Sequence, residues 1–420
     1  MVPALACAIA LAAIAPLRPD ESARSLDLAL AALLGGIAVQ LVPLPGAVGS
    51  WLSPGREPLV AALSLAPPPA WAPLSINPAD TVYALAVVLS AILTFASCRT
   101  IFAHRGRREV CRGIGWLGLL LACTGMVQRA VSPDRIYGFW APHDTGALPF
   151  GPFINRNHAA TWLVMGASVC VGYLMARLHG PGSRAAGVSS LRQSADSRTV
   201  WLAIAGITMV IGIGVSLSRS GALALGTAAA GLLAAGRPRL SRSGTFWIVG
   251  VAVVAGAVFM TLGQFATLVG RVVDTAVSGP PGRSLIWRDT LSAVGDFWLT
   301  GGGAGTYERM MFLYQTTDRA YYFNQAHNHY LQVLAEGGLL LVVPLLLALG
   351  AFARVARERL RADRSGMFWI RAGSAAGLVG IAVQSGWETG LRLPANAQMA
   401  AVLAALVIHP VTSLVESEHA

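Results

Sequence analysis

Apolar runs that are poor in charge recur along the whole chain, and they restrict what it can fold into. A helix needs about 20 such residues to cross a bilayer. Only 12% of the residues are charged, against about 25% in an average globular domain. We therefore expect an all-α, polytopic transmembrane helix bundle of about 11 spans, within a range of roughly 10–12, that forms a single membrane domain over residues 1–420. The runs fall at 3–17, 26–44, 79–98, 113–130, 158–176, 200–217, 221–236, 246–269, 330–353, 366–387 and 393–410.

Arginine placement predicts the orientation of these spans, because short cytoplasmic loops collect positive charge. The strongly basic connections are 102–112, 177–198, 236–242 and 354–364. They alternate correctly with the other loops, so we assign them to the cytoplasmic side. The outward-facing loops are then the long polar stretch 271–329 and the shorter stretches 45–78, 131–157, 218–221 and 388–392.

The basic residues also limit the chemistry. The net charge is +11 and all 31 basic residues are arginine, so no lysine nucleophile or base is present. They are spread over the loops and form no groove-like patch, which argues against nucleic acid as a partner. Outward-facing arginines suit an anionic lipid-linked ligand, since a guanidinium binds phosphate oxygens in a bidentate fork. The five cysteines show no CxxC spacing, which argues against a disulfide framework or a zinc site.

Consecutive hydrogen-bonding residues open the fifth apolar run, within FGPFINRNHAATW (150–162). Asparagine is a common helix cap, and a cap accounts for one of the two asparagines. A rim that binds sugar would account for the others. The candidate substrate-binding residues here are Asn155, Arg156, Asn157 and His158.

Arg219 stands between two apolar runs in VSLSRSGALALG (215–226), with Ser218 and Ser220 beside it. A serine at this point can cap the helix that follows, and a helix N-terminus is itself an anion site. An interfacial arginine that reaches lipid headgroups is an equal alternative.

The long outward-facing stretch carries two further arginines, Arg283 and Arg288, in PGRSLIWRDTLSAVGDFWLTGGGAGTY (281–307). The apolar pattern predicts an amphipathic helix from about Ser284, with Arg283 just before it and Arg288 one turn in. The glycines between 301 and 305 allow a tight turn or a close approach to a ligand. No GK[ST] follows, so this is not a Walker loop.

Two histidines close that stretch in NQAHNHYLQVLAEGGLLL (324–341). His329, Gln332 and Glu336 share one helical face, which suits a hydrogen-bonded stripe inside a bundle. His327 lies at the junction of loop and helix, where it can meet a hydroxyl group that arrives from the aqueous side. No cysteine and no HExxH pattern supports a metal site. Glu336 either forms a hydrogen bond to a neighbouring helix or contacts the substrate.

These motifs, in this order, resemble the O-antigen ligase and O-antigen polymerase family of bacterial envelope glycosyltransferases. The resemblance runs from about residue 74 and includes PLSINPADT, GPFINRNH, SRSG, GRSLIWRD with its following glycines, and HNHYLQ-x-x-x-E-x-G. The chain departs from the family at Trp298 and Leu299, where a proline usually precedes the glycine turn.

The resemblance implies a membrane-embedded fold of the GT-C type in the bacterial inner membrane. The stretch 271–329 would be a large periplasmic loop that carries site residues, with 45–78 and 131–157 as smaller ones. The donor would be a glycan on undecaprenyl diphosphate, used without metal or cofactor. By motif, Arg219 and Arg283 would bind the diphosphate, Arg288 is grouped with them, and His327 would be catalytic.

We expect transfer of a saccharide from undecaprenyl diphosphate to an acceptor at the periplasmic face, and first of all an O-antigen ligase with lipid A–core or a similar acceptor. An O-antigen or exopolysaccharide polymerase with a glycan acceptor is a close alternative, and a protein O-glycosyltransferase is a third. A polysaccharide flippase or transporter is an alternative from another class. A transporter would place polar residues at mid-membrane and show internal repeats, whereas here they gather at one face.

Overall fold

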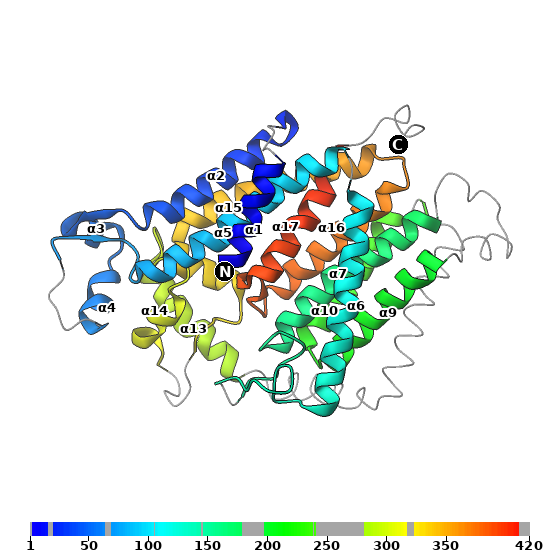
Figure 1. The fold of residues 1–420 in the computed structure, drawn as a ribbon. Coiled ribbons are helices and arrows are strands. Elements are labelled where there is room, and N and C mark those ends of the chain that lie inside the picture. The colour runs from blue at the N-terminus through cyan, green and yellow to red at the C-terminus, as the bar shows by residue number, and fades with distance from the viewer. Residues whose placement is uncertain are drawn as a thin grey trace. The chain divides into compact units, whose positions relative to one another are not determined.

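The computed structural model describes residues 2–15, 20–63, 69–104, 106–143, 146–178, 197–237, 239–240, 281–316 and 323–410. The expected span at 246–269 and most of the basic connection at 177–198 lie outside these residues. Within them the chain is almost wholly helical (Figure 1). One two-stranded antiparallel sheet joins β1 (Pro43–Pro45) to β2 (Trp71–Pro73).

The expected membrane spans coincide with helices wherever they fall in the described residues. Seven of these helices are long and apolar enough to cross a membrane. By label they are α2 (Arg24–Val39, extended in front by η1, Glu21–Ala23), α5 (Pro78–His104), α6 (Arg107–Val131), α7 (Arg156–Leu178), α9 (Ser197–Val215), α15 (His329–Ala362) and α16 (Met367–Gln384). The all-α, multi-pass class is therefore confirmed.

Three further expected spans form shorter or less apolar helices: α1 (Val2–Ile14), α10 (Arg219–Gly236) and α17 (Pro394–Ile408). With 13 residues, α1 extends about 20 Å at 1.5 Å per residue. That is short of the ~30 Å hydrocarbon core of a bilayer. Whether α1 spans the membrane by itself stays a prediction.

The chain divides into two compact units, here called the first and the second unit. The first comprises Met1–Ala96, Ser278–Val355 and Ser385–Ala397. Besides helices already named, it holds the short helices α3 (Gly46–Leu52), α4 (Arg56–Leu63), α13 (Pro281–Asp296) and α14 (Tyr307–Tyr314). Leu59, Phe297, Tyr307 and Met310 are fully buried in its core. Much of the stretch expected as one long loop is thus folded helix packed on an apolar core.

The second unit comprises Ser97–Val277, Ala356–Gln384 and Gln398–Ala420. Its central helix is α7. Within that helix, 83% of an 18-residue apolar stretch is buried inside the protein. Small residues let α16 approach α7 closely. A Cβ atom on Gly172 would lie 2.6 Å from the carbonyl oxygen of Trp369, and one on Gly373 would lie 2.5 Å from that of Ser168. Close backbone contact through small residues is a usual way for membrane helices to pack.

Helix α15 is broken near its start, in the first unit. Gly338 has φ 53° and ψ −156°, which ends the helical hydrogen-bond pattern. The glycine turn lies against the break: Gly303 N donates to Glu336 O at 2.9 Å, and Leu340 N donates to Leu299 O at 2.9 Å. A Cβ atom on Gly301 would lie 2.1 Å from Glu336 O. The glycines of this turn are therefore required by close approach of another part of the backbone.

Candidate functional site

His327 lies in the loop that enters α15, as the sequence predicts. Asn328 caps the helix, because its Oδ1 accepts hydrogen bonds from Tyr330 N and Leu331 N, each at 3.1 Å. His327 itself has φ 49°, a left-handed conformation that is uncommon for a residue with a side chain. Its imidazole is 31% exposed. The loop therefore presents a partly accessible histidine from a constrained backbone.

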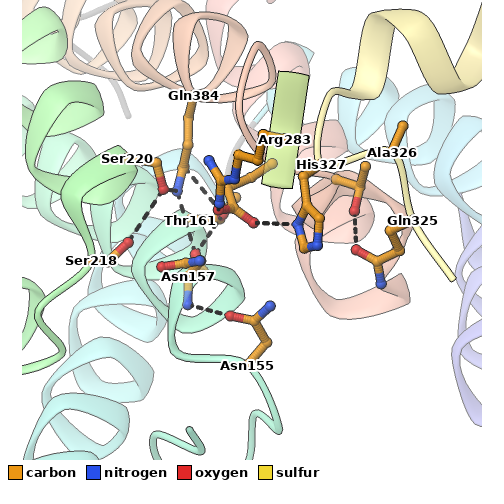
Figure 2. A network of polar contacts seen from close by, with 12 residues as sticks. Asn155, Asn157, Thr161, Ser218, Ser220, Arg283, Gln325, Ala326, His327 and Gln384 are labelled. Atoms are coloured by element: carbon orange, nitrogen blue, oxygen red, sulfur yellow. Dashed lines mark hydrogen bonds and ion pairs between the residues drawn. The ribbon is translucent and has the colours of Figure 1, made fainter. Parts of the chain in front are cut away.

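A buried carboxylate, that of Glu388, joins His327 to Arg283. Arg283 Nη2 lies 3.0 Å from Glu388 Oε1, and His327 Nδ1 lies 3.9 Å from Glu388 Oε2. The first contact is a charge-assisted hydrogen bond, and the second is ion-pair distance but too long for a hydrogen bond. Figure 2 shows the side chains of Arg283 and His327 turned toward this point. Glu388 is 2% exposed and Arg283 is 29% exposed.

Sequence analysis missed Glu388. The available signal is its place in the short polar connection between α16 and α17, where a carboxylate beside two apolar runs has no evident role in membrane insertion. Nothing in the sequence brings it to Arg283, which is 105 positions away.

The two arginines of α13 have different surroundings. The helix begins at Pro281, so the prediction of a start near Ser284 is wrong, and Arg283 lies inside the first turn. Proline suits that turn because it has no N–H to leave unpaired. Arg288 follows five residues later, about 140° around the helix at ~100° per residue. Its side chain is 65% exposed, 3.7 Å from Asp289, and the contacts of Glu388 do not include it.

Glu336 contacts the glycine turn. Its Oε2 accepts a hydrogen bond from Gly305 N at 2.8 Å, and its Oε1 accepts one from Tyr307 N at 3.3 Å, so the carboxylate caps the start of α14. Gln332 Nε2 donates to the same Oε1 at 2.9 Å, which is the hydrogen-bonded stripe expected on this face. Arg392 Nη2 lies 3.9 Å from it. These contacts favour a structural role for Glu336, in which its carboxylate bonds neighbouring elements, over a contact with substrate.

In the second unit, the polar residues at the start of α7 form a cap and a link. Asn155 Oδ1 accepts a hydrogen bond from Asn157 N at 2.8 Å, which is the capping role expected for one asparagine. Asn157 O accepts from Thr161 Oγ1 at 3.0 Å and from Gln384 Nε2 at 3.4 Å. Arg156 is part-buried and His158 is buried. A sugar-binding role for this group stays a prediction.

Arg219 begins α10, with Ser218 as the predicted cap: Ser218 Oγ accepts from Gly221 N at 3.1 Å. Its side chain is exposed at that helix N-terminus. Gln384, at the end of α16, donates to Ser220 Oγ at 3.4 Å and accepts from Thr161 Oγ1 at 3.1 Å. Figure 2 shows Gln384 pointing toward Ser220 and Thr161. This link was not foreseen.

The sequence-predicted residues therefore fall into two sets. His327, Arg283, Arg288 and Glu336 belong to the first unit, whereas Arg219 and the group at 155–158 belong to the second. That Arg219 and Arg283 bind one ligand stays a prediction. Within the described residues, no group of three or more His, Cys, Asp or Glu side chains is placed to hold a metal ion.

A comparison with protein families identifies part of the chain. Residues 202–346 match the family model described as O-antigen ligase. Over this stretch, the chain is similar to the O-antigen ligase family. The match includes the motifs around Arg219, Arg283 and His327 and confirms the resemblance they suggested, whereas GPFINRNH and Glu388 lie outside it. No curated protein matches the chain.

Proposed function

We propose that this membrane protein transfers a saccharide from undecaprenyl diphosphate to an acceptor hydroxyl at the periplasmic face of a bacterial inner membrane. The first choice is an O-antigen ligase with lipid A–core as the acceptor. The observation that carries the proposal is the Glu388 carboxylate, which contacts Arg283 on one oxygen and faces His327 on the other.

His327 would act as the base. A carboxylate that faces Nδ1 favours the tautomer with the proton on Nδ1, so Nε2 is left to accept a proton from the acceptor hydroxyl. The 3.9 Å separation is compatible with this role, because catalytic hydrogen bonds are often long until substrate is bound. The acceptor oxygen then bonds to the anomeric carbon, and the bond from that carbon to the diphosphate oxygen breaks.

Arg283 would receive the leaving group. A guanidinium has five N–H donors, so its contact with Glu388 leaves donors for phosphate oxygens. The departing diphosphate develops negative charge, which fixed cations stabilise. The family resemblance assigns Arg219 to the same diphosphate and groups Arg288 with it. The hydrogen-bonding residues at 155–158 would form a rim that binds sugar. These assignments remain proposals.

The test is transfer of a purified undecaprenyl-diphosphate glycan to lipid A–core by the full-length protein in detergent. His327→Ala should abolish transfer, since a positioned base contributes about 10²–10⁴-fold. His329→Ala, two residues further along at the start of α15, is the matched control and should keep measurable activity. Normal rates in His327→Ala, or complete loss only in His329→Ala, would reverse the assignment.

The same assay separates the alternative functions. Lengthening of the lipid-linked glycan without lipid A–core would indicate a polymerase, and glycan on protein would indicate a protein O-glycosyltransferase. Movement of the glycan across vesicle membranes without any new glycosidic bond would indicate a transporter.

A further inference from the structure

The backbone just before His327 is held by the side chains of Gln332 and Trp287. The residue before it, Ala326, is fully buried, and it lies beside His327 in Figure 2. Its N–H donates to Gln332 Oε1 at 3.2 Å, and its carbonyl accepts from Trp287 Nε1 at 3.0 Å. Both backbone polar groups of Ala326, the residue that leads into His327, are thus fixed by side chains of neighbouring helices.

Gln332 suits this position because its side chain must accept one hydrogen bond and donate another at the same time. Its Oε1 accepts from Ala326 N, while its Nε2 donates to Glu336 Oε1 at 2.9 Å. A backbone N–H can only donate and a carboxylate can only accept, so one orientation of the amide satisfies both partners. The side chain is 1% exposed, and a buried donor or acceptor left without a partner destabilises the fold.

The conformation that these contacts hold is itself unfavourable. A non-glycine residue at φ 49° is strained, and this conformation persists only where surrounding contacts enforce it. The next residues are held as well, since Asn328 caps α15 and His329 N donates to Ser385 O at 2.8 Å. Without the contacts to Ala326, the loop would relax and the imidazole would leave Glu388.

We propose that Gln332 is a positioning residue: its amide bridges Ala326 N and Glu336 and so keeps His327 in the left-handed conformation that faces its imidazole toward Glu388. The inference rests on the proposed function, because it assumes that His327 acts as the base. Gln332 touches neither donor nor acceptor in this role. Its loss should therefore lower kcat and leave the KM values for both substrates unchanged.

The first test is Gln332→Met, which keeps size and burial but removes the bridge. We expect kcat to fall by about 10–100-fold, the range that follows from misplacing a reacting group by about 1 Å. Gln128→Met is the matched control. Gln128 is also a buried glutamine, and its Nε2 donates to Arg135 O at 2.9 Å. It belongs to the second unit, so its replacement should leave kcat unchanged.

The second test distinguishes positioning from general stability. In Gln332→Glu, a protonated side chain can donate to Glu336 and accept from Ala326, as the amide does, whereas an ionised one cannot donate. Lower pH favours the protonated side chain. The other charged or titratable groups near this point are His329 on the same helix, Tyr307 and Arg392. The backbone N–H of Tyr307 donates to Glu336 Oε1 at 3.3 Å, and the guanidinium of Arg392 lies 3.9 Å from Glu336.

The activity of Gln332→Glu, as a fraction of the wild-type activity at the same pH, should therefore rise as the pH falls. The wild-type activity itself should fall, since a histidine base must be neutral to accept a proton. A variant that merely folds poorly would lose activity at every pH. Trp287→Phe, which removes only the donor to Ala326 O, provides a milder change and should lower kcat by several-fold.

The outcomes also separate this inference from the proposed function. If the wild type transfers no glycan from undecaprenyl diphosphate, the proposed function fails. If the wild type is active while folded Gln332→Met matches it in kcat, or Gln332→Glu follows the wild-type pH profile, the positioning role fails and the proposed function survives.

Discussion

Glu388→Gln is the most informative change at the proposed site. The substitution keeps the size of the buried side chain but removes the charge that Arg283 and His327 face. A hydrogen bond to a charged group contributes about 1.5–3 kcal/mol. Since each 1.4 kcal/mol is a factor of ten, loss of this support in the transition state predicts a fall in kcat of about 10–150-fold.

The assay is glycan transfer at saturating donor and acceptor, with KM measured for each. Glu109→Gln is the control: it removes the carboxylate of another arginine pair, with Arg112 at 2.8 Å, which is exposed. It should leave kcat and KM unchanged. A loss confined to the donor KM would mean that Glu388 acts only on Arg283. Wild-type kinetics in folded Glu388→Gln would refute the orienting role altogether.

Three further predictions follow from the geometry and the topology. Gly301→Ala should prevent stable folding, because its Cβ atom would lie 2.1 Å from a backbone oxygen, whereas Gly350→Ala meets nothing within 4 Å and should be tolerated; thermal unfolding in detergent compares them. Arg219→Lys and Arg283→Lys should each reduce transfer, because a point charge does not replace a bidentate fork. If one diphosphate contacts both arginines, their effects should be non-additive in a double-mutant cycle. A cysteine at Thr316 should react with a membrane-impermeant reagent in spheroplasts, while cysteines in the basic loops should not.

Hydropathy was sufficient to place the long apolar helices because each apolar run must be long enough to cross the bilayer and must pair its own backbone groups. The start of α13 was missed because no apolar residue marks its first turn, which is set by Pro281. The sequence also indicated that His327 lies outside the helical stripe of Gln332 and Glu336. That separation follows from the ~100° rotation per residue, and the hydrogen bond between Gln332 and Glu336 confirms the stripe.

The contacts that complete the site could not be predicted in this way. Glu388 reaches Arg283 across 105 positions, and Trp287 reaches Ala326 across 39. Such pairs depend on how the helices pack, and a single sequence carries no record of it. The left-handed backbone of His327 was equally hidden, since residue type favours such a conformation mainly for glycine.

The break in α15 explains a further residue that the sequence left without a role. In a membrane, every backbone group released from a helix must find another partner. Because Leu340 N donates to Leu299 O, the carbonyl of Glu336 loses its helical donor, and it accepts instead from Gly303 N at 2.9 Å and from Gln40 Nε2 at 2.9 Å. Gln40 also accepts from Ala304 N at 2.9 Å and is fully buried. A single glutamine at the end of α2 thus provides hydrogen-bond partners for backbone groups of both the broken helix and the glycine turn. The break lets the short half-helix that carries Gln332 and Glu336 pack on the glycine turn, so the loop of His327 is set by polar contacts that a continuous helix would not leave available.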